Sequence, residues 1–245
     1  MPKQTVVIIH GIGEHEKGWS KEFQYHLLKK ISPADINFVE ICYSQILDMG
    51  LKEYTMNEHN IKELGCDDFR KLFNMTMFDA ISYGYTRKAI YDLIERKVPK
   101  DAQNVTVIAH SLGGIVAYDW IYHSQENPKN KRIISNFFTL GSPLALKMIS
   151  RKHELNLKYW LNIVGEYDII GKPMKISPAN MKQVNRDYIC PIGSFVQRRT
   201  PFCHTAYFED GNVIKPIVEK LRIDISGKKF NEKAYNNYID ELWKV

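Results

Sequence analysis

Short apolar runs recur along this 245-residue chain, and most of them are followed by a turn and a helical pattern. The runs cover residues 5–9, 38–42, 105–109, 137–140 and 160–164, and the helical patterns cover 20–31, 87–96, 114–124 and 212–221. Apolar runs with little polar alternation are typical of strands that are buried on both faces of a parallel sheet. Their alternation with helices therefore predicts an α/β fold with a mainly parallel sheet.

Two stretches depart from this alternation. Residues 45–85 have a helical pattern without a clear strand and are rich in methionine and phenylalanine. We expect them to form a helical insertion, which either caps a pocket or packs as extra helices at the sheet edge. Residues 171–203 contain four prolines and predict a long connection with one strand at 184–189.

The composition is ordinary for a globular protein, with 44% hydrophobic and 25% charged residues. Basic residues outnumber acidic ones by 34 to 28 but are scattered, which favours a solvated surface over one that binds nucleic acid or an anionic membrane. No apolar stretch approaches the roughly 20 residues of a membrane span, and the four cysteines are not spaced like metal ligands or a disulfide framework. We therefore expect a single cytoplasmic domain over residues 1–245, with reduced thiols and an oligomeric state that the sequence leaves open.

A serine lies between a predicted strand and a predicted helix in the segment from Ala109 to Gly114, which reads Ala-His-Ser-Leu-Gly-Gly. Small residues two positions before and after Ser111 suit the tight turn of a nucleophile elbow, in which the strand and helix backbones nearly touch. Such a turn lifts the hydroxyl out of the sheet at the start of a helix, where the helix dipole favours negative charge. The pattern predicts that Ser111 is a catalytic nucleophile.

Polar segments follow four of the predicted strands. They are His10-Gly11-Ile12-Gly13, His110-Ser111, Gly141-Ser142-Pro143 and Gly165-Glu166-Tyr167-Asp168. Open parallel sheets bind ligands beyond the carboxyl ends of their strands. The coincidence of these segments at one edge therefore indicates an active site there.

A serine hydroxyl needs a base, which is commonly a histidine held by a carboxylate. Folds with this elbow place them in the chain order serine, acid, histidine, and His204 is the one histidine after residue 168. Asp168 and Glu166 both follow a predicted strand. We favour Asp168, because it lies farther into the turn, and keep Glu166 as the alternative. Asp119 lies about 12 Å along the helix from Ser111, away from this edge.

The other polar groups of these segments have supporting roles in the prediction. The backbone N–H groups of Ile12 and Leu112 are the expected oxyanion hole. We expect His110 to be structural, because side chains at adjacent positions of a sharp turn diverge, and Ser142 to line the pocket. The potential ligands His10, Glu14, His15 and Glu16 match no established zinc spacing, so neither a metal nor another cofactor is expected.

These segments resemble the α/β-hydrolase superfamily, in particular its small lipase- and esterase-like members. The resemblance is carried by Val-Ile-Ile-His10-Gly-Ile-Gly, Ala109-His-Ser111-Leu-Gly-Gly, Thr139-Leu-Gly-Ser-Pro143, Val164-Gly-Glu-Tyr-Asp168 and Cys203-His204. Position 109 is alanine where the simplest elbow signature has glycine, and lipase-like members commonly carry alanine there. The resemblance spans about residues 5–221 and implies a reduced, mainly parallel sheet of about six strands flanked by helices.

We therefore expect a serine hydrolase that cleaves a carboxylic ester through an acyl-enzyme, with Ser111, His204 and Asp168 as its catalytic residues. The expected substrate is a small-molecule ester, and the methionines and aromatics of residues 45–85 favour an apolar acyl group. Acyl transfer or thioester hydrolysis by the same residues is the alternative. A non-catalytic binding protein with the same fold is the less favoured one. Acyl chain length and the alcohol group are not encoded in any pattern that we identify.

Overall fold

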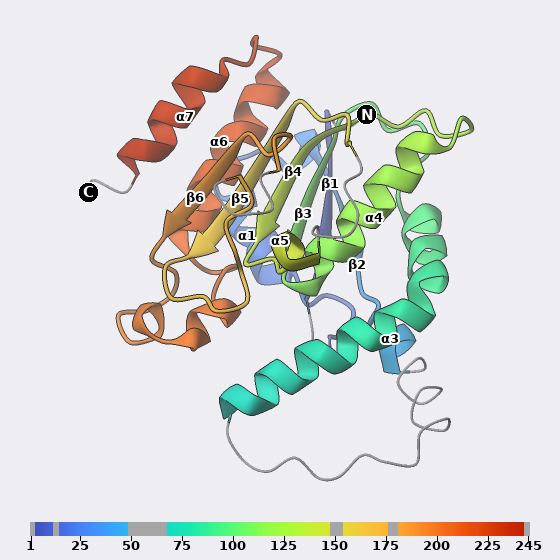
Figure 1. Cartoon of the computed structure of the whole chain (residues 1–245). Helices are drawn as coiled ribbons and strands as arrows, with labels where there is room; N and C mark the ends of the chain where they lie inside the picture. The colour runs from blue at the N-terminus through green and yellow to red at the C-terminus, as the bar shows by residue number, and fades with distance from the viewer. Residues whose placement is uncertain (1–2, 12–14, 49–67, 148–153, 176–180, 243–245) are drawn as a thin grey trace.

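The computed structural model describes residues 3–11, 15–48, 68–147, 154–175 and 181–242, with the backbone alone for residues 68–81, 146–147 and 201. Six strands form one sheet at its centre (Figure 1). In chain order they are β1 (Gln4–Ile9), β2 (Ile36–Ile41), β3 (Val105–His110), β4 (Ile134–Leu140), β5 (Tyr159–Gly165) and β6 (Arg186–Cys190). Their spatial order is β2-β1-β3-β4-β5-β6, and every neighbouring pair is parallel. The predicted mainly parallel sheet of about six strands is confirmed.

Burial follows the position of each strand in the sheet. Every residue of β1, β4 and β5 is buried, whereas the edge strands β2 and β6 contain partly exposed positions. Strands of a parallel sheet that are covered on both faces read as continuous apolar runs. This is why the runs in the sequence located the central strands so well.

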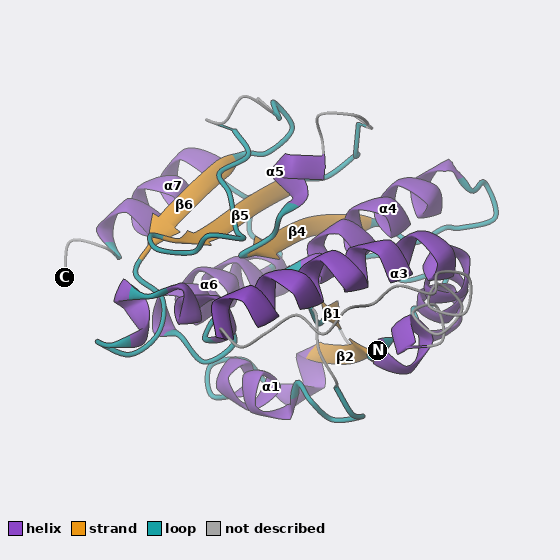
Figure 2. Ribbon diagram, turned by 60° about the horizontal axis from the view of Figure 1, so that its bottom comes forward, coloured by secondary structure: helices purple, strands orange, loops and turns teal. Residues whose placement is uncertain are grey.

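The helices cover both faces of this sheet (Figure 2). They are α1 (Lys21–Leu28), α3 (Asp68–Lys97), α4 (Leu112–Glu126), α5 (Leu144–Lys147), α6 (Gly211–Ser226) and α7 (Glu232–Glu241). Side chains alternate along a strand, so Val7 and Ile9 pack in one core with α3 and α4. Val6 and Ile8 point to the other core, which α1, α6 and α7 cover.

The segment that was predicted to be a helical insertion, residues 45–85, is helical where it is described. Residues 44–48 are helical, and residues 68–85 belong to α3, a helix of 30 residues that continues to Lys97. Residues 49–67 lie outside the described residues, so the cap remains a prediction. None of the helices in the described ranges is long and apolar enough to cross a membrane.

Candidate active site

Ser111 lies in a sharp turn between β3 and α4. Its backbone has φ 54° and ψ −128°, and among the described residues it is the one non-glycine residue with positive φ. L-residues adopt this conformation only where the surrounding structure holds them in it. Here the neighbouring backbones are so close that a Cβ atom on Gly113 would lie 2.2 Å from the carbonyl oxygen of His10. A Cβ atom on Gly11 would lie 2.5 Å from that of Ser111, so this turn requires glycine at both positions.

Three of the predicted site residues form a continuous chain of hydrogen bonds. The Nε2 atom of His204 lies 2.9 Å from Ser111 Oγ, and its Nδ1 atom lies 2.8 Å from Asp168 Oδ2. Ionised Asp168 can only accept, so Nδ1–H donates to it and Nε2 is left to accept the serine hydroxyl. The three residues come from the turn after β3, the turn after β5 and the short 3-10 helix Pro201–Thr205 after β6. All three side chains are buried.

The carboxylate of Asp168 accepts four hydrogen bonds. Its Oδ1 atom accepts from the backbone N–H groups of Ile170 and Gly171, and its Oδ2 atom accepts from His204 and from the Tyr207 hydroxyl. Burial alone would raise the pKa of Asp168. The hydrogen bond and the charge of His204, together with the hydrogen bonds from Tyr207 and Gly171, lower this pKa below its ordinary value. The group is therefore a fixed negative charge behind the imidazole.

Glu166, the other acid considered from the sequence, lies in the same turn but has an exposed side chain. Its backbone N–H donates to the Cys190 carbonyl at 3.1 Å. The structure therefore brings Asp168, and not Glu166, into contact with His204.

Tyr207 is a site residue that the sequence analysis missed. Its hydroxyl donates to Asp168 Oδ2 at 2.7 Å and accepts the N–H of Gly165 at 2.7 Å. Burial and the negative charge of Asp168 raise the pKa of Tyr207 well above its usual range, so the hydroxyl remains a donor. Tyr207 lies two residues beyond the end of the short helix that carries His204, and no motif in the sequence identifies it.

His110, which precedes the serine, does not contact Ser111 Oγ. Its Nε2–H donates to the backbone carbonyl of His204 at 2.8 Å. Burial, with a smaller contribution from the neighbouring His204, lowers the pKa of His110 to about 3, so its ring is neutral. His110 thus holds the backbone of the histidine segment against the elbow.

The loop after β1 is fixed by hydrogen bonds to the end of β2. His10 Nε2 accepts the backbone N–H of Tyr43 at 3.1 Å, and the Tyr43 hydroxyl donates to the His10 carbonyl at 2.8 Å. The two rings stack with centroids 4.1 Å apart. Since His10 Nδ1 donates to the carbonyl of Gly11, both ring nitrogens are used within the protein. Burial and the nearby His15 lower the pKa of His10 to about 3.

Of the two N–H groups predicted to form the oxyanion hole, one can be placed. Leu112 is the first residue of α4, so its N–H has no acceptor within the helix and faces the same edge as Ser111. Ile12 lies outside the described residues, and so does Glu14. Within the described ranges, no three His, Cys, Asp or Glu side chains are arranged to hold a metal ion.

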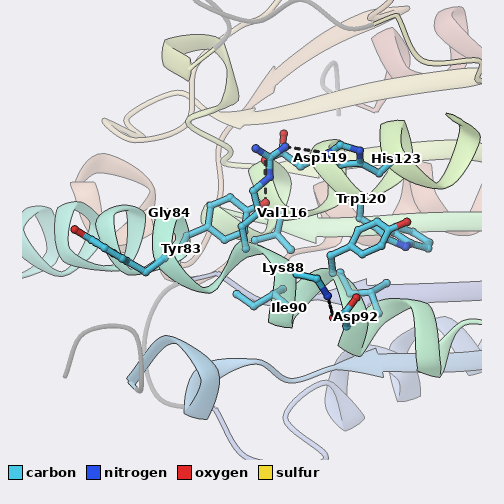
Figure 3. A pocket seen from close by; sticks show the side chains of 13 residues that line it. Tyr83, Gly84, Lys88, Ile90, Asp92, Val116, Asp119, Trp120 and His123 are labelled. Carbon is cyan, nitrogen blue, oxygen red and sulfur yellow. Dashed lines mark hydrogen bonds and ion pairs between the residues drawn. The ribbon is translucent and has the colours of Figure 1, made fainter. Parts of the chain in front are cut away.

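A separate cavity of about 520 Å³ lies between α3 and α4 (Figure 3). It contains Asp119, which accepts the Tyr83 hydroxyl at 2.8 Å and pairs with Arg87 Nε at 3.4 Å. Arg87 Nη2 also lies 3.2 Å from His123 Nε2. None of Ser111, His204 and Asp168 lines this cavity, so Asp119 is remote from the hydrogen-bonded chain, as its position on the helix predicted.

Comparison with known proteins shows what parts of this chain are similar to. The model of the PGAP1-like alpha/beta domain matches residues 68–168, which is less than half of the chain. Over 62 residues the chain is 37% identical to a protein of Schizosaccharomyces pombe described as a probable mitochondrial phospholipase. The aligned part is 23% of this chain but only 8% of that protein. Superposition on the crystal structure of esterase PE8 covers 90% of this chain and 92% of the esterase, with 13% identity and a TM-score of 0.49.

The family match runs from the start of α3 to Asp168 and therefore includes the elbow. This elbow follows β3, which has two strands of the all-parallel sheet on one side and three on the other. A serine in a strained strand-to-helix turn at the top of such a sheet is the hallmark of one fold. The chain has the α/β-hydrolase fold.

Proposed function

We propose that this protein is a serine hydrolase that cleaves carboxylic esters through an acyl-enzyme. Ser111 is the nucleophile, His204 is the general base and acid, and Asp168 orients the imidazole. The observation that carries the proposal is the unbroken chain of hydrogen bonds from Asp168 Oδ2 to His204 at 2.8 Å and from His204 to Ser111 Oγ at 2.9 Å.

The geometry supports a two-step reaction. As Ser111 Oγ attacks the ester carbonyl carbon, His204 Nε2 takes its proton, and the carbonyl oxygen becomes an oxyanion that the N–H groups of Leu112 and Ile12 stabilise. Collapse of this intermediate breaks the bond to the alcohol oxygen, which receives the proton from His204. Water then repeats the sequence on the acyl-enzyme: His204 takes a proton from the water, which attacks the acyl carbon, and returns it to Ser111.

Asp168 and its partners stabilise the imidazolium of His204 that forms in each step. Its pKa lies below the ordinary value, so it is ionised at neutral pH. Tyr207 fixes the orientation of this carboxylate through Oδ2. His110, neutral because burial lowers its pKa to about 3, adds no positive charge beside His204. The proposed roles of these two residues are to position the reacting groups.

The similarity to a protein described as a phospholipase makes a lipid ester with an apolar acyl group the first substrate class to test. A chain-length series of p-nitrophenyl esters measures the acyl preference. Parallel assays with acyl thioesters, and with added alcohol acceptors, separate ester hydrolysis from thioester hydrolysis and acyl transfer.

A pair of serine variants tests the nucleophile. Ser142 is the matched control, because it is also buried at this edge and its Oγ accepts a local bond, from the Leu144 N–H at 3.2 Å. We expect Ser111→Ala to abolish both labelling by a fluorophosphonate probe and hydrolysis of p-nitrophenyl esters, whereas Ser142→Ala retains both. Circular dichroism confirms that each variant is folded. Labelling of a folded Ser111→Ala protein, or no labelling of the wild type, would contradict the proposal.

A further inference from the structure

Four exposed apolar side chains, called the apolar patch below, lie on the loops that follow β5 and β6. The patch consists of Tyr167, Phe195, Val196 and Phe202, which are 52%, 62%, 72% and 48% exposed. These are four of the eight large apolar residues that the described chain exposes. Large apolar side chains on the surface of a monomer are usually scattered singly, and a cluster of them marks an interaction site.

The patch lies at the same edge of the sheet as Ser111. Phe202 and His204 belong to the same short helix, Pro201–Thr205. The thiol of Cys203 interacts with the backbone of Tyr167, which joins the two loops. Figure 1 shows the segment after β6, in orange, projecting beyond the carboxyl ends of β5 and β6. A ligand surface that covers this patch therefore also faces the proposed active site.

Local hydrogen bonds hold the tip of this segment in place. Ser194 Oγ accepts the Gln197 N–H at 3.4 Å, and Gln197 Oε1 accepts the Ser194 N–H at 3.0 Å. This reciprocal pairing has the hydrogen-bond pattern of a capping box, two residues before the N-cap Val196 of the short 3-10 helix Gln197–Arg199. The Ser194 carbonyl also accepts the Arg198 N–H at 2.9 Å. Phe195 and Val196 lie between the paired residues and are held outward, although folding them inward would bury their apolar surface.

Two arginines surround the tip. The guanidinium of Arg199 lies 4.5 Å from the ring centroid of Phe195, and that of Arg198 lies 5.5 Å from it. No ion pair formed between described residues includes either arginine. Two acidic residues adjoin Tyr167 in the sequence: Glu166 is exposed, whereas Asp168 is buried and bonded to His204 and Tyr207. The exposed Glu166 and the two arginines together give the surface around the patch a net charge of +1. Aromatic side chains at headgroup level and unpaired cations near lipid phosphates are the features of a membrane-interface surface.

We propose that this patch docks the protein on an anionic phospholipid surface, with the apolar side chains among the headgroups and Arg198 and Arg199 on lipid phosphates. The docking itself is independent of catalysis. Its consequence, that the ester comes from the lipid layer, rests on the proposed function. A protein partner or a second copy of the chain is the competing occupant, and the experiment below separates them from lipid.

The test is co-sedimentation with vesicles of phosphatidylcholine, either pure or with roughly one third phosphatidylglycerol. We expect the wild type and Ser111→Ala to bind the anionic vesicles equally. Phe195→Ser with Val196→Ser should lower the partition coefficient by about tenfold or more. Arg198→Gln with Arg199→Gln should lower it by roughly tenfold on anionic vesicles and little on neutral ones. Hydrolysis of a short soluble ester should be unchanged in both double variants.

Tyr25→Ser is the matched control. Tyr25 is 60% exposed on α1, and Lys29 Nζ lies 4.5 Å above its ring, so it reproduces an aromatic–cation pair away from the patch. Its vesicle binding should equal that of the wild type. Thermal melts establish that every variant is folded.

Three outcomes would overturn the proposal: no binding of the wild type to anionic vesicles, equal binding of Phe195→Ser/Val196→Ser, or an equal loss in Tyr25→Ser. A concentration-dependent dimer that Phe195→Ser/Val196→Ser abolishes, without vesicle binding, would assign the patch to a second copy. Vesicle binding by a wild type that hydrolyses no ester would refute the proposed function and leave the docking surface standing.

Discussion

Asp168 and Asp119 are both buried aspartates that accept a hydrogen bond from a tyrosine, Asp168 from Tyr207 at 2.7 Å and Asp119 from Tyr83 at 2.8 Å. Each also has a histidine nearby. Asp168 contacts His204 directly, whereas Asp119 pairs with Arg87, which in turn bonds to His123. The two clusters thus use nearly the same residue types at different places in the fold.

The difference lies in the cation that faces each aspartate. A guanidinium keeps its proton at any pH at which the protein is folded, so Arg87 neutralises Asp119 permanently. Arg87 also donates to Nε2 of His123 and so occupies the nitrogen that would act as a base. His204 instead has its Nε2 atom 2.9 Å from Ser111 Oγ. The proposed chemistry therefore depends on whether a histidine or an arginine faces the buried aspartate.

Replacing each aspartate by asparagine tests this comparison with the largest expected effect. Asp168→Asn should lower kcat for ester hydrolysis by roughly three to four orders of magnitude, because the imidazole loses both its orientation and its counter-charge. Asp119→Asn should leave kcat within about twofold and lower the free energy of unfolding by about 2 kcal/mol, because Arg87 loses its partner. Steady-state kinetics and urea unfolding measure the two quantities. A large loss of kcat in Asp119→Asn would refute the distinction between the clusters.

The two tyrosines sharpen the comparison with a smaller effect. Tyr207→Phe and Tyr83→Phe each remove a hydrogen bond to a buried carboxylate, so each should lower the free energy of unfolding by about 1.5–3 kcal/mol. Tyr207→Phe alone should also lower kcat by about tenfold with little change in KM, because Asp168 then holds the imidazole less firmly. If both variants lose stability and neither loses kcat, Tyr207 is a structural residue only.

The pH dependence of stability gives the smallest of the three effects. The pKa of His110 is lowered to about 3 in the folded protein, so the unfolded chain binds the proton first. The stability contributed by neutral His110 is therefore complete above pH 6.5 and is lost as the pH falls towards 3. Between pH 7 and 5 this loss is about 1–2 kcal/mol. His110→Gln should reduce the change in unfolding free energy over this interval by that amount, as measured by urea unfolding at both pH values. An unchanged pH dependence would mean that the ring is charged in the folded state.

The parts of this structure that follow from local patterns were predictable from the sequence. The apolar runs located five of the six strands, and β6 matches the strand predicted at 184–189 within the long connection. The short segments at Ser111 and His204 located residues that meet in space although they are 93 positions apart. The chain order serine, acid, histidine selected His204, which the periodicity of the sequence could not do. The choice between Asp168 and Glu166 needed the structure, because both follow β5 and only the turn decides which carboxylate is buried.

The residues that the sequence did not reveal act through distant partners. Tyr207 binds a carboxylate 39 positions away, and Tyr43 binds His10 across 33 positions. A single tyrosine forms no sequence pattern from which a hydrogen bond to so distant a residue could be predicted. Helix α7 was missed because its sequence is mostly polar and only Tyr235 and Ile239 are buried. Its N-terminus at Asn231, whose side chain accepts the Ala234 N–H, becomes recognisable once the helix is known.

The backbone of Ser111, with φ 54° and ψ −128°, lowers the stability of the fold, because this conformation is strained for a residue other than glycine. Glycine enters this region without steric cost, so Ser111→Gly relaxes the turn while removing the hydroxyl. Under the proposed function, serine at position 111 lowers stability and is required by the reaction, so selection for stability alone would favour glycine there. On that proposal, a lineage without the activity would lose this serine early, and its proteins would be more stable and inactive.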